Sequence, residues 1–537
     1  MTPNQRLLVA VLASIVFFVG YTAIFPPVQP EAAKELKTDK VALKQDNKQV
    51  VETKDLSAIA GHEISEQEQA AVTSATNTIL TVSNKNFILK VDTLGRISSK
   101  ELLQEKFRNK EDNNAQLIPS FGAKPLYIRF LNEKLNAEAS SVAYVASVSE
   151  VNLDDKPVKI TLTQKLSDVS VTKEITFYSD GHYDVVINVS KDKRYFVYVG
   201  QRPHINTNEQ MMTMKGALVY TDDEIQTIIE DGDAEGRKTF TGVELVAAFD
   251  QYTTTMMYNL GKDTTVIIDR DRDNNPVAYF DALPTMKFSG YIGQKNYATL
   301  HSIKPVLTNV IEYGWFTFAS KPLFALLSWL HGIFGNWGWA IIGLVTIIRA
   351  VLYPLTYKGM MSMQKIKDLA PKLKEIKEKY KGDPQRLNAA TMDMYKKHGA
   401  NPLGGCLPML LQIPVFFAIY RVLLNAVELQ GAPWMLWITD LSRMDQYYIL
   451  PLLMGASMYY QQKLTPTSFT DPMQEKIMKF LPVIFTFFFI TFPSGLVLYW
   501  FVNNLFSIAQ QFIVNIQFKN AKDAEIAAHK KHGKKDD

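Results

Sequence analysis

The sequence predicts a polytopic α-helical membrane protein with six transmembrane helices and a large all-β domain outside the membrane. One uncharged run near the N-terminus and five apolar runs after residue 336 are candidates for crossing a hydrocarbon core about 30 Å thick. Between them, residues 78–315 consist of short alternating runs separated by turn sequences, a pattern typical of β-strands. These two patterns predict two bodies with different solvent preferences.

Composition argues against several classes of function. Lys and Arg number 58 and Asp and Glu number 54, so the net charge of +4 predicts no general affinity for nucleic acid. The single cysteine, Cys406, excludes an internal disulfide and any site that needs several cysteines. The chain contains no HExxH, P-loop or GxSxG motif. We therefore expect no covalent catalysis, no metal site and no cofactor.

Residues 1–26 are expected to form an N-terminal transmembrane anchor. The uncharged run at 7–25 is long enough to span the bilayer at about 1.5 Å per helical residue. A cleaved signal peptide is the alternative, but Arg6 is a weak basic start and the sequence after the run is a poor cleavage site. Residues 27–77 are charged and almost without aromatic side chains, which predicts a flexible linker.

The β-domain is expected at 78–315 and is followed by a helix at the membrane surface. Alternation is clear at 159–163 and at 183–189, with a turn signal at 180–181. Residues 316–335 combine aromatic and polar side chains with leucines, so we expect an amphipathic helix in the membrane interface.

The membrane core is expected at 336–516. The last two apolar runs are separated by Pro493, Ser494 and Gly495, which predicts two helices joined by a turn. With the anchor, the predicted spans number six, and those of the core are 339–357, 406–426, 447–461, 477–492 and 496–516.

Positive charge predicts the orientation of these spans. The loop at 358–400 is rich in lysine, whereas the loop at 427–446 has Arg443 as its one basic residue. By the positive-inside rule the lysine-rich loop is cytoplasmic, both termini are cytoplasmic, and the β-domain lies outside. The basic tail at 517–537 agrees with this orientation.

The loop at 358–400 is expected to be a charged helical hairpin. Gly382, Asp383 and Pro384 end one helix and begin the next, with Asp383 as N-cap. A solvated connector is one interpretation, and a contact surface for an anionic partner is the other, because exposed lysines favour RNA and acidic proteins. The candidate contact residues are Lys374, Lys377, Lys379, Lys530, Lys531, Lys534 and Lys535.

Arg349 is the polar residue that stands out in the membrane core. It lies well inside the second predicted span, where an arginine costs about 2.5 to 3.5 kcal/mol on insertion scales. Thr346 precedes it by three residues, and Tyr353 and Thr356 follow it by four and seven, so one face of the helix is expected to be polar. The predicted core spans contain no Asp or Glu, which favours an uncompensated cation in a wet cavity. The alternative is an arginine that extends to the cytoplasmic interface.

Other predicted spans of the core also contain polar residues. Gln412 lies in the third predicted span. Arg421 is expected to be an anchor at the outer interface, near Glu428. The last span carries a polar stripe made of Trp500, Asn503, Asn504, Ser507 and Gln511.

Several motifs resemble those of the YidC insertases, in order and spacing, from about residue 314 to residue 516. The matching residues are Gly314-Trp315 with Pro322-Leu323-Phe324, Gly335-Asn336-Trp337-Gly338, Arg349 with Tyr353-Pro354-Leu355-Thr356, Asn401-Pro402-Leu403-Gly404-Gly405-Cys406, Asp471-Pro472-Met473-Gln474 and Phe492-Pro493-Ser494-Gly495-Leu496. The anchor and long outer domain are similar to the Gram-negative form of this family. Oxa and Alb insertases of organelles share the membrane core.

The resemblance implies a protein of the bacterial inner membrane with a periplasmic domain of β-supersandwich fold. It implies a hydrophilic groove open to cytoplasm and lipid, with Arg349 as the groove arginine and Gln412, Tyr499 and Trp500 on helices that line or flank it. The family inserts small membrane proteins alone and assists the Sec translocon with larger ones. The implied partners are nascent membrane proteins, the Sec translocon, the ribosome or a targeting receptor, and membrane lipid, with no nucleotide.

Two other classes of function remain as alternatives. A small-solute or anion transporter would use Arg349 as its binding site, but it predicts two related halves, and no internal repeat is apparent. A membrane-anchored carbohydrate-active domain leaves five spans unexplained and lacks a recognisable pair of carboxylates. On the sequence, the groove residues of an insertase are expected to be Arg349, Thr346, Tyr353, Gln412, Tyr499, Trp500 and Asn503.

Overall fold

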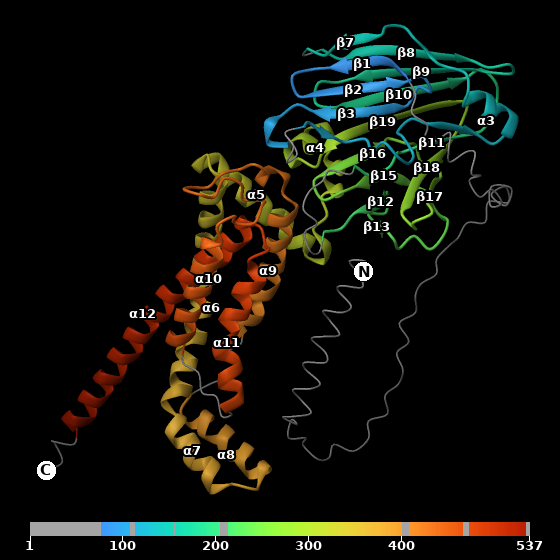
Figure 1. The fold of residues 1–537 in the computed structure, drawn as a ribbon. Coiled ribbons are helices and arrows are strands. Elements are labelled where there is room, and N and C mark those ends of the chain that lie inside the picture. The colour runs from blue at the N-terminus through green and yellow to red at the C-terminus, as the bar shows by residue number, and fades with distance from the viewer. Residues whose placement is uncertain are drawn as a thin grey trace, which may run out of the picture.

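The computed structural model describes residues 77–107, 113–154, 156–203, 213–399, 407–465 and 472–532. The predicted anchor and nearly all of the predicted linker lie outside these residues, as do Cys406 and the last five residues of the tail. Figure 1 shows an all-β domain and a helical region that meet at one end of the helices. The helices α7 and α8 and the C-terminal end of α12 lie at the opposite end (Figure 1).

Three sheets form the β-domain, which confirms the predicted all-β body. The described strands of the nine-stranded sheet are, in spatial order, β13 (Gln226–Glu230), β12 (Gly216–Thr221), β15 (Val243–Phe249), β16 (Thr253–Tyr258), β19 (Thr285–Gln294), β10 (His182–Val189), β9 (Ser170–Phe177), β8 (Val158–Lys165) and β6 (Val145–Ala146). One five-stranded sheet contains β4 (Ala115–Gln116), β3 (Ile97–Leu102), β2 (Phe87–Asp92), β1 (Thr78–Ser83) and β7 (Glu150–Asn152). The other contains β14 (Lys238–Phe240), β17 (Val266–Arg270), β18 (Pro276–Ala282), β11 (Tyr195–Tyr198) and β5 (Ile128–Phe130).

Alternating side chains explain why the sheets pack face to face. In β10, Tyr183, Val185 and Ile187 are buried, whereas the residues between them are partly exposed. The strands pair antiparallel, apart from the parallel pair of β1 and β7. All three sheets contribute to one apolar core. Because successive residues of a strand point to opposite faces, this alternation fixes which face is buried.

Two lysines cross this core. Lys173 of β9 is fully buried, and its Nζ donates to the backbone oxygens of Gly95 and Leu126, both at 2.8 Å. Lys100 of β3 is also buried, and its Nζ donates to the backbone oxygen of Ile292 at 2.5 Å. Each ammonium therefore joins a strand to backbone outside its own sheet. Burial lowers the pKa of both lysines to about 7.

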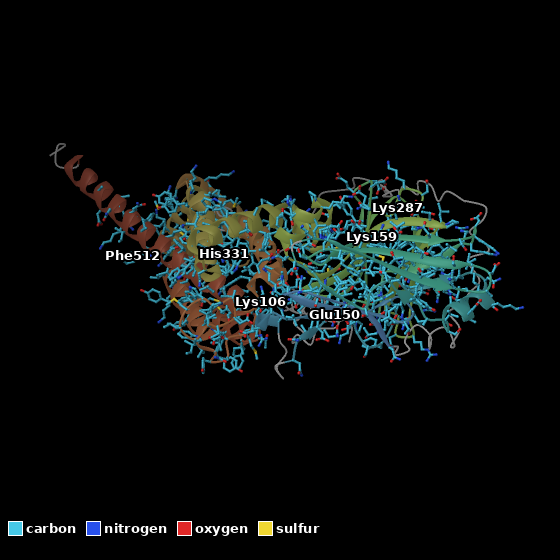
Figure 2. All side chains as sticks on the ribbon, turned by 90° about the horizontal axis from the view of Figure 1, so that it is seen from above. Lys106, Glu150, Lys159, Lys287, His331 and Phe512 are labelled. Carbon is cyan, nitrogen blue, oxygen red and sulfur yellow. The ribbon has the colours of Figure 1, made fainter. Side chains whose placement is uncertain are left out.

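Short helices connect the strands and join the β-domain to the helical region. They are η2 (Glu105–Phe107), α3 (Glu133–Ala139), α4 (Tyr297–Ile303), η3 (Pro305–Val310), η4 (Gly314–Phe316) and η6 (Val427–Leu429). At the junction, Oε1 of Glu428 accepts hydrogen bonds from Nδ2 of Asn296 and from the backbone N of Tyr297, both at 3.0 Å. Lys106 of η2 lies against Gly431 at the same junction (Figure 2).

The predicted partner of Arg421 is wrong. Nη1 of Arg421 lies 3.5 Å from Oε2 of Glu312, which follows η3, whereas Glu428 receives the hydrogen bonds from the start of α4. The sequence placed Glu428 nearest along the chain, but Glu312 reaches the site only through the fold of the β-domain. Arg421 is therefore part of the junction between the two regions.

The long helices of the second region are α5 (Thr317–Phe334), α6 (Trp337–Asp368), α7 (Ala370–Lys379), α8 (Pro384–Lys397), α9 (Leu407–Asn425), α10 (Ile449–Leu464), α11 (Pro472–Phe489) and α12 (Ser494–His532). The turn between α11 and α12 lies where Pro493 predicted it, and Ser494 donates its Oγ to the backbone oxygen of Arg443 at 2.8 Å. Asp383 caps α8, with its Oδ1 accepting from the backbone N of Arg386 at 3.0 Å.

Two helices are longer than predicted. Helix α6 continues past residue 357 to Asp368, and α12 continues past residue 516 into the predicted tail. Neither extension contains a proline or glycine cluster that would stop it, and the break after α6 comes beside Pro371. Both helices therefore continue as charged segments beyond the membrane spans predicted from apolar residues.

Within the described residues, α6 and the first part of α12 are long and apolar enough to cross a membrane. Shorter apolar stretches occupy 412–425 and 479–489. Length and composition of the described helices therefore do not establish all six predicted spans.

Candidate functional site

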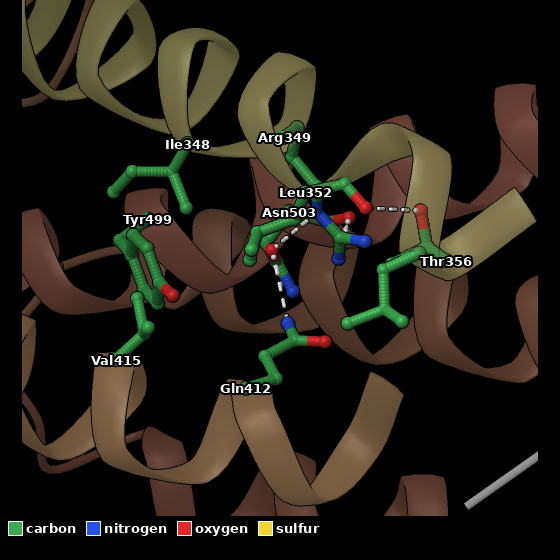
Figure 3. A pocket seen from close by; sticks show the side chains of 9 residues that line it. Ile348, Arg349, Leu352, Thr356, Gln412, Val415, Tyr499 and Asn503 are labelled. Atoms are coloured by element: carbon green, nitrogen blue, oxygen red, sulfur yellow. Dashed lines mark hydrogen bonds between the residues drawn. The ribbon is translucent and has the colours of Figure 1, made fainter. Parts of the chain in front are cut away.

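Arg349 lies at the centre of the candidate site, on the side of α6 that packs against α12. Its side chain is buried, with 6% of its surface exposed, and it points into the space between α6, α9 and α12 (Figure 3). The alternative of an arginine that extends along the helix to an exposed interface therefore does not describe this structure.

Four contacts join the guanidinium to α12. Nε donates to Oδ1 of Asn503 at 2.8 Å. Nη2 donates to the backbone oxygen of Asn503 at 3.1 Å and to Oγ of Ser507 at 2.7 Å. Nη1 lies 3.5 Å from Oε1 of Gln510, which makes this the weakest of the four contacts. The guanidinium is thus fixed mainly through two of its three nitrogens.

All four acceptors are uncharged. No Asp or Glu among the described residues forms an ion pair with Arg349. An arginine keeps its proton under all ordinary conditions, so the site holds a positive charge that hydrogen bonds solvate but do not neutralise. This agrees with the absence of acidic residues from the predicted core spans.

Asn503 joins three helices at this point. Its Oδ1 accepts from Nε of Arg349 and also from Nε2 of Gln412, at 3.2 Å, as the dashed lines of Figure 3 show. Arg349 belongs to α6, Gln412 to α9 and Asn503 to α12. One amide oxygen therefore uses both of its lone pairs to hold the arginine and the glutamine together.

A small pocket opens beside this hydrogen-bonded group. It has room for about one water molecule, so protein groups surround the guanidinium more than water does in this structure. The pocket is lined by Ile348, Arg349, Leu352, Leu355, Thr356, Gln412, Val415, Tyr499 and Asn503. The wet cavity predicted around Arg349 corresponds in this structure to this small pocket.

Known proteins resemble this chain over almost its whole length. The membrane protein insertase YidC of Wolinella succinogenes is 47% identical over 531 residues, which covers 98% of this chain and 97% of that protein. The chain belongs to the YidC membrane protein insertase family. The YidC proteins of Campylobacter jejuni and Helicobacter pylori are 47% and 42% identical, covering 95% and 98% of this chain and 96% and 99% of their own lengths.

Two family models divide the chain between them. The YidC periplasmic domain matches residues 79–326, and the 60Kd inner membrane protein matches residues 329–522. The change from one to the other falls within α5, beyond the last strand. Arg349, Gln412 and Asn503 all belong to the inner-membrane match. The site therefore lies in the part of the chain that matches the inner membrane protein model and not in the part that matches the periplasmic domain.

The structure brings together four of the seven predicted groove residues of this YidC family member. Arg349, Gln412, Tyr499 and Asn503 line the same pocket. Trp500 lies outside it, in an aromatic group with Phe416, at 4.7 Å between ring centroids, and with Phe489, at 5.3 Å. Its Nε1 is buried and has no hydrogen-bond partner among the described residues.

Two residues of the polar face predicted for α6 do not line this pocket, and their place in a groove stays a prediction. Thr346 is exposed and donates to the backbone oxygen of Ile342 on its own helix, at 2.8 Å. Tyr353 is half-buried beside Tyr357, and neither Thr346 nor Tyr353 lines the pocket. At about 100° per residue, Thr346 and Tyr353 lie on one side of Arg349, and the residues that pack towards the pocket lie on the other. Spacing alone cannot tell which side faces a partner helix.

Sequence reasoning missed part of the site. Gln510 was not among the predicted polar residues, although it lies seven residues after Asn503 and so shares its face. Ser507 was placed on the polar stripe but not in the groove. Asn504 lies on another side of α12, where its Nδ2 donates to Oγ of Ser457 in α10 at 3.1 Å.

The predicted partner-contact lysines are only partly described. Lys374 and Lys377 line a shallow pocket at the turn between α7 and α8, together with Tyr380 and Lys381. Lys379 lies beside it, with its Nζ 5.7 Å from the ring centroid of Tyr380. Lys530 and Lys531 belong to α12, and Lys534 and Lys535 follow the described residues. The described residues contain no group of His, Cys, Asp and Glu that would hold a metal ion.

Proposed function

We propose that this chain inserts the transmembrane helices of other proteins into the bacterial inner membrane and helps them to fold. Relatives that bear the name membrane protein insertase over the full length support this activity. The observation that carries the mechanism is the burial of Arg349 among neutral acceptors between α6 and α12.

The mechanism follows from the cost of charge in lipid. A substrate that inserts a helix must move its polar flank across a core where each charge is expensive. The permanent charge of Arg349 attracts an acidic or polar flank into a groove that the cytoplasm and lipid both reach. The apolar segment then leaves sideways, past side chains such as Phe487, which is 74% exposed. No nucleotide or cofactor takes part in this sequence of steps.

The proposed topology has six spans: the N-terminal anchor and α6, α9, α10, α11 and α12. The 19 residues of α9 reach about 28 Å, close to the thickness of a bilayer core. The lysine-rich α7 and α8 lie at the end opposite the β-domain (Figure 1), which supports cytoplasmic termini and a periplasmic β-domain. A protease added to spheroplasts should cleave the β-domain and spare the loop at 380–383. Cleavage of that loop alone would contradict this orientation.

The proposed partners are nascent membrane proteins, membrane lipid, the Sec translocon, and the ribosome or a targeting receptor. The lysines of α7 and the basic tail support an anionic partner on the cytoplasmic side. The same exposed charges also suit a solvated connector, so only a binding measurement separates these two interpretations.

Reconstitution in liposomes tests the proposed function directly. The purified chain should insert two model substrates, one with an acidic outer tail and one with a neutral tail, and should not conduct small anions. Arg349→Ala should lower insertion of the acidic substrate most. Arg421→Ala is the control, because it removes an arginine that has a carboxylate partner, Glu312.

Two results would contradict the proposal. Equal activity of Arg349→Ala and the parent on both substrates would remove Arg349 from the mechanism. Anion flux without peptide insertion would favour the transporter.

A further inference from the structure

We infer that Asn503 is the positioning residue of the site: it aims one edge of the Arg349 guanidinium at the substrate and keeps its charge available. This inference rests on the proposed function of Arg349. It concerns how the charge is held, because a cation in a helical bundle is useful to a substrate only if no neighbour neutralises it.

The first step is the unequal use of the three guanidinium nitrogens. Asn503 takes Nε through its Oδ1 and Nη2 through its backbone oxygen, at 2.8 and 3.1 Å, and Ser507 takes the other hydrogen of Nη2 at 2.7 Å. Nη1 has the 3.5 Å contact with Gln510 as its one partner among the described residues. Because Nη1 carries two hydrogens, at least one of them is free for a ligand.

The second step is the space beside the guanidinium of Arg349. The pocket beside Arg349 is lined by Thr356 and Leu355 of α6 and by Gln412 of α9, so the Arg349 side chain is next to the space between these helices. Figure 3 shows the guanidinium between Asn503 and the side of Thr356. A carboxylate is larger than the one water molecule that this pocket holds, so the helices must separate to admit it, and Nη1 is the guanidinium nitrogen with a hydrogen left to donate.

The third step is the neutrality of Asn503. An asparagine oxygen binds the guanidinium as an acceptor but adds no charge, whereas an aspartate of the same shape would form an ion pair with it. Asn503 is 8% exposed, so such an ion pair would be poorly screened by water. The amide also accepts from Gln412 at 3.2 Å, which an aspartate would still allow.

Asn503→Asp tests the inference because it should preserve the fold and reduce insertion of the acidic-tailed substrate. The new carboxylate has a cation beside it, so the thermal midpoint of the full-length protein in detergent should stay the same or rise. Insertion of the acidic-tailed substrate should fall roughly ten- to hundredfold, the range expected when a hydrogen bond to a charged group is lost. Insertion of the neutral-tailed substrate should fall less than insertion of the acidic-tailed substrate.

Asn504→Asp is the matched control. Asn504 is also buried, but within the described residues it donates to Ser457 and to the backbone of Met454 in α10, neither of which is a cation. The control should lower the thermal midpoint, because it buries an unpaired carboxylate, and should reduce both substrates alike.

A double variant separates positioning from a structural role. In an Arg349→Ala background, Asn503→Asp should have no further effect on the preference between the two substrates, because it acts through the arginine. A loss of preference in Arg349→Ala but not in Asn503→Asp would overturn the role of Asn503 and leave the proposed function intact. If Arg349→Ala itself had no effect, the proposed role of Arg349 would fail first.

Discussion

The β-domain and the helical region both bury cations, but they hold them with different groups. In the β-domain, Lys173 donates to two backbone oxygens, and burial lowers its pKa to about 7. In the helical region, Arg349 is held by the side chains of Asn503 and Ser507 and by one backbone oxygen. The first cation joins sheets, and the second faces a pocket.

The difference lies in whether the charge is permanent. A buried lysine can release its proton, so its amine remains a hydrogen-bond donor without the full cost of a buried charge. An arginine cannot do this. A permanent charge in a membrane region costs about 2.5 to 3.5 kcal/mol on insertion scales. The cation that can become neutral therefore suits structure, and the one that cannot suits the attraction of a substrate.

Among tests of this difference between the two cations, the largest effect is expected for Arg349→Lys, which places a lysine, the cation that the β-domain buries, at the site. A lysine provides a point charge, so insertion of an acidic-tailed substrate should be largely kept at pH 6. By pH 9 a buried lysine can be neutral, and insertion should fall about tenfold relative to the parent. The measurement is liposome insertion across this pH range with the parent protein as control. If Arg349→Lys were as active as the parent at pH 9, the claim that the site needs a permanent charge would be wrong.

The next effect concerns the stability of the β-domain. The pKa of Lys100 and of Lys173 is about 7 in the folded chain against an ordinary 10.5, so between pH 7 and 10 the unfolded chain binds more protons. The free energy of unfolding should therefore rise with pH, by about 1 kcal/mol per pH unit for each lysine. Below pH 7 both states are protonated and this dependence should end.

Thermal unfolding of the full-length protein, followed by the circular dichroism of its strands, measures this slope. Lys173→Met should flatten the slope by about half, because one of the two titrating amines is removed. Exposed Lys159→Met on β8 is the control and should leave the slope as it is. A slope that is the same in all three proteins would mean that the buried lysines do not titrate in this range.

A smaller effect is expected at the junction, where Arg421 has the carboxylate partner that Arg349 lacks. The atoms lie 3.5 Å apart and Arg421 is partly exposed, so the coupling between Arg421 and Glu312 should be about 1 kcal/mol or less. A double-mutant cycle with Arg421→Met and Glu312→Gln, read by thermal unfolding, measures it. A coupling several times larger would show that the junction depends on this pair.

The smallest effect is expected for the lysines near the C-terminus. Replacing Lys519, Lys530, Lys531, Lys534 and Lys535 by glutamine should weaken ribosome co-sedimentation a few-fold at low salt and less at high salt. Lys522 is left unchanged, because its Nζ lies 2.5 Å from Oδ1 of Asp368 and helps to hold α12 against α6. Unchanged binding at both salt concentrations would leave the solvated-connector interpretation.

Local signals predicted much of the architecture. Pro493 and the group at 382–384 separate helices where the sequence placed the breaks. The strong alternation of β10 was recognisable, but the order of the sheets was not, because pairings such as β10 with β19 join residues about 100 positions apart. The predicted membrane spans end before α6 and α12 do, because charged residues continue both helices.

The buried cations show where sequence reasoning was sufficient and where it was not. The depth of Arg349 followed from its place in an apolar run, but its acceptors on α12 did not. Lys173 was missed, although its neighbours Val171 and Ile175 are inward residues of the same strand, so a lysine on the apolar face was visible. The burial of Lys100 was not visible in the sequence. The burial pattern of β3 is irregular, and the pairing of β2 with β3 contains a register shift.

The length of α12 gives the site a mechanical property. The 39 residues from Ser494 to His532 form one unbroken helix of about 58 Å, and Asn503 lies about a quarter of the way along it. A rigid rod that pivots near its first turn magnifies displacement towards its far end. A movement of about 1 Å at Asn503 thus becomes about 4 Å at the other end, in proportion to distance along the axis. A spectroscopic probe attached near the end of α12 would therefore report on the occupancy of a site far from it.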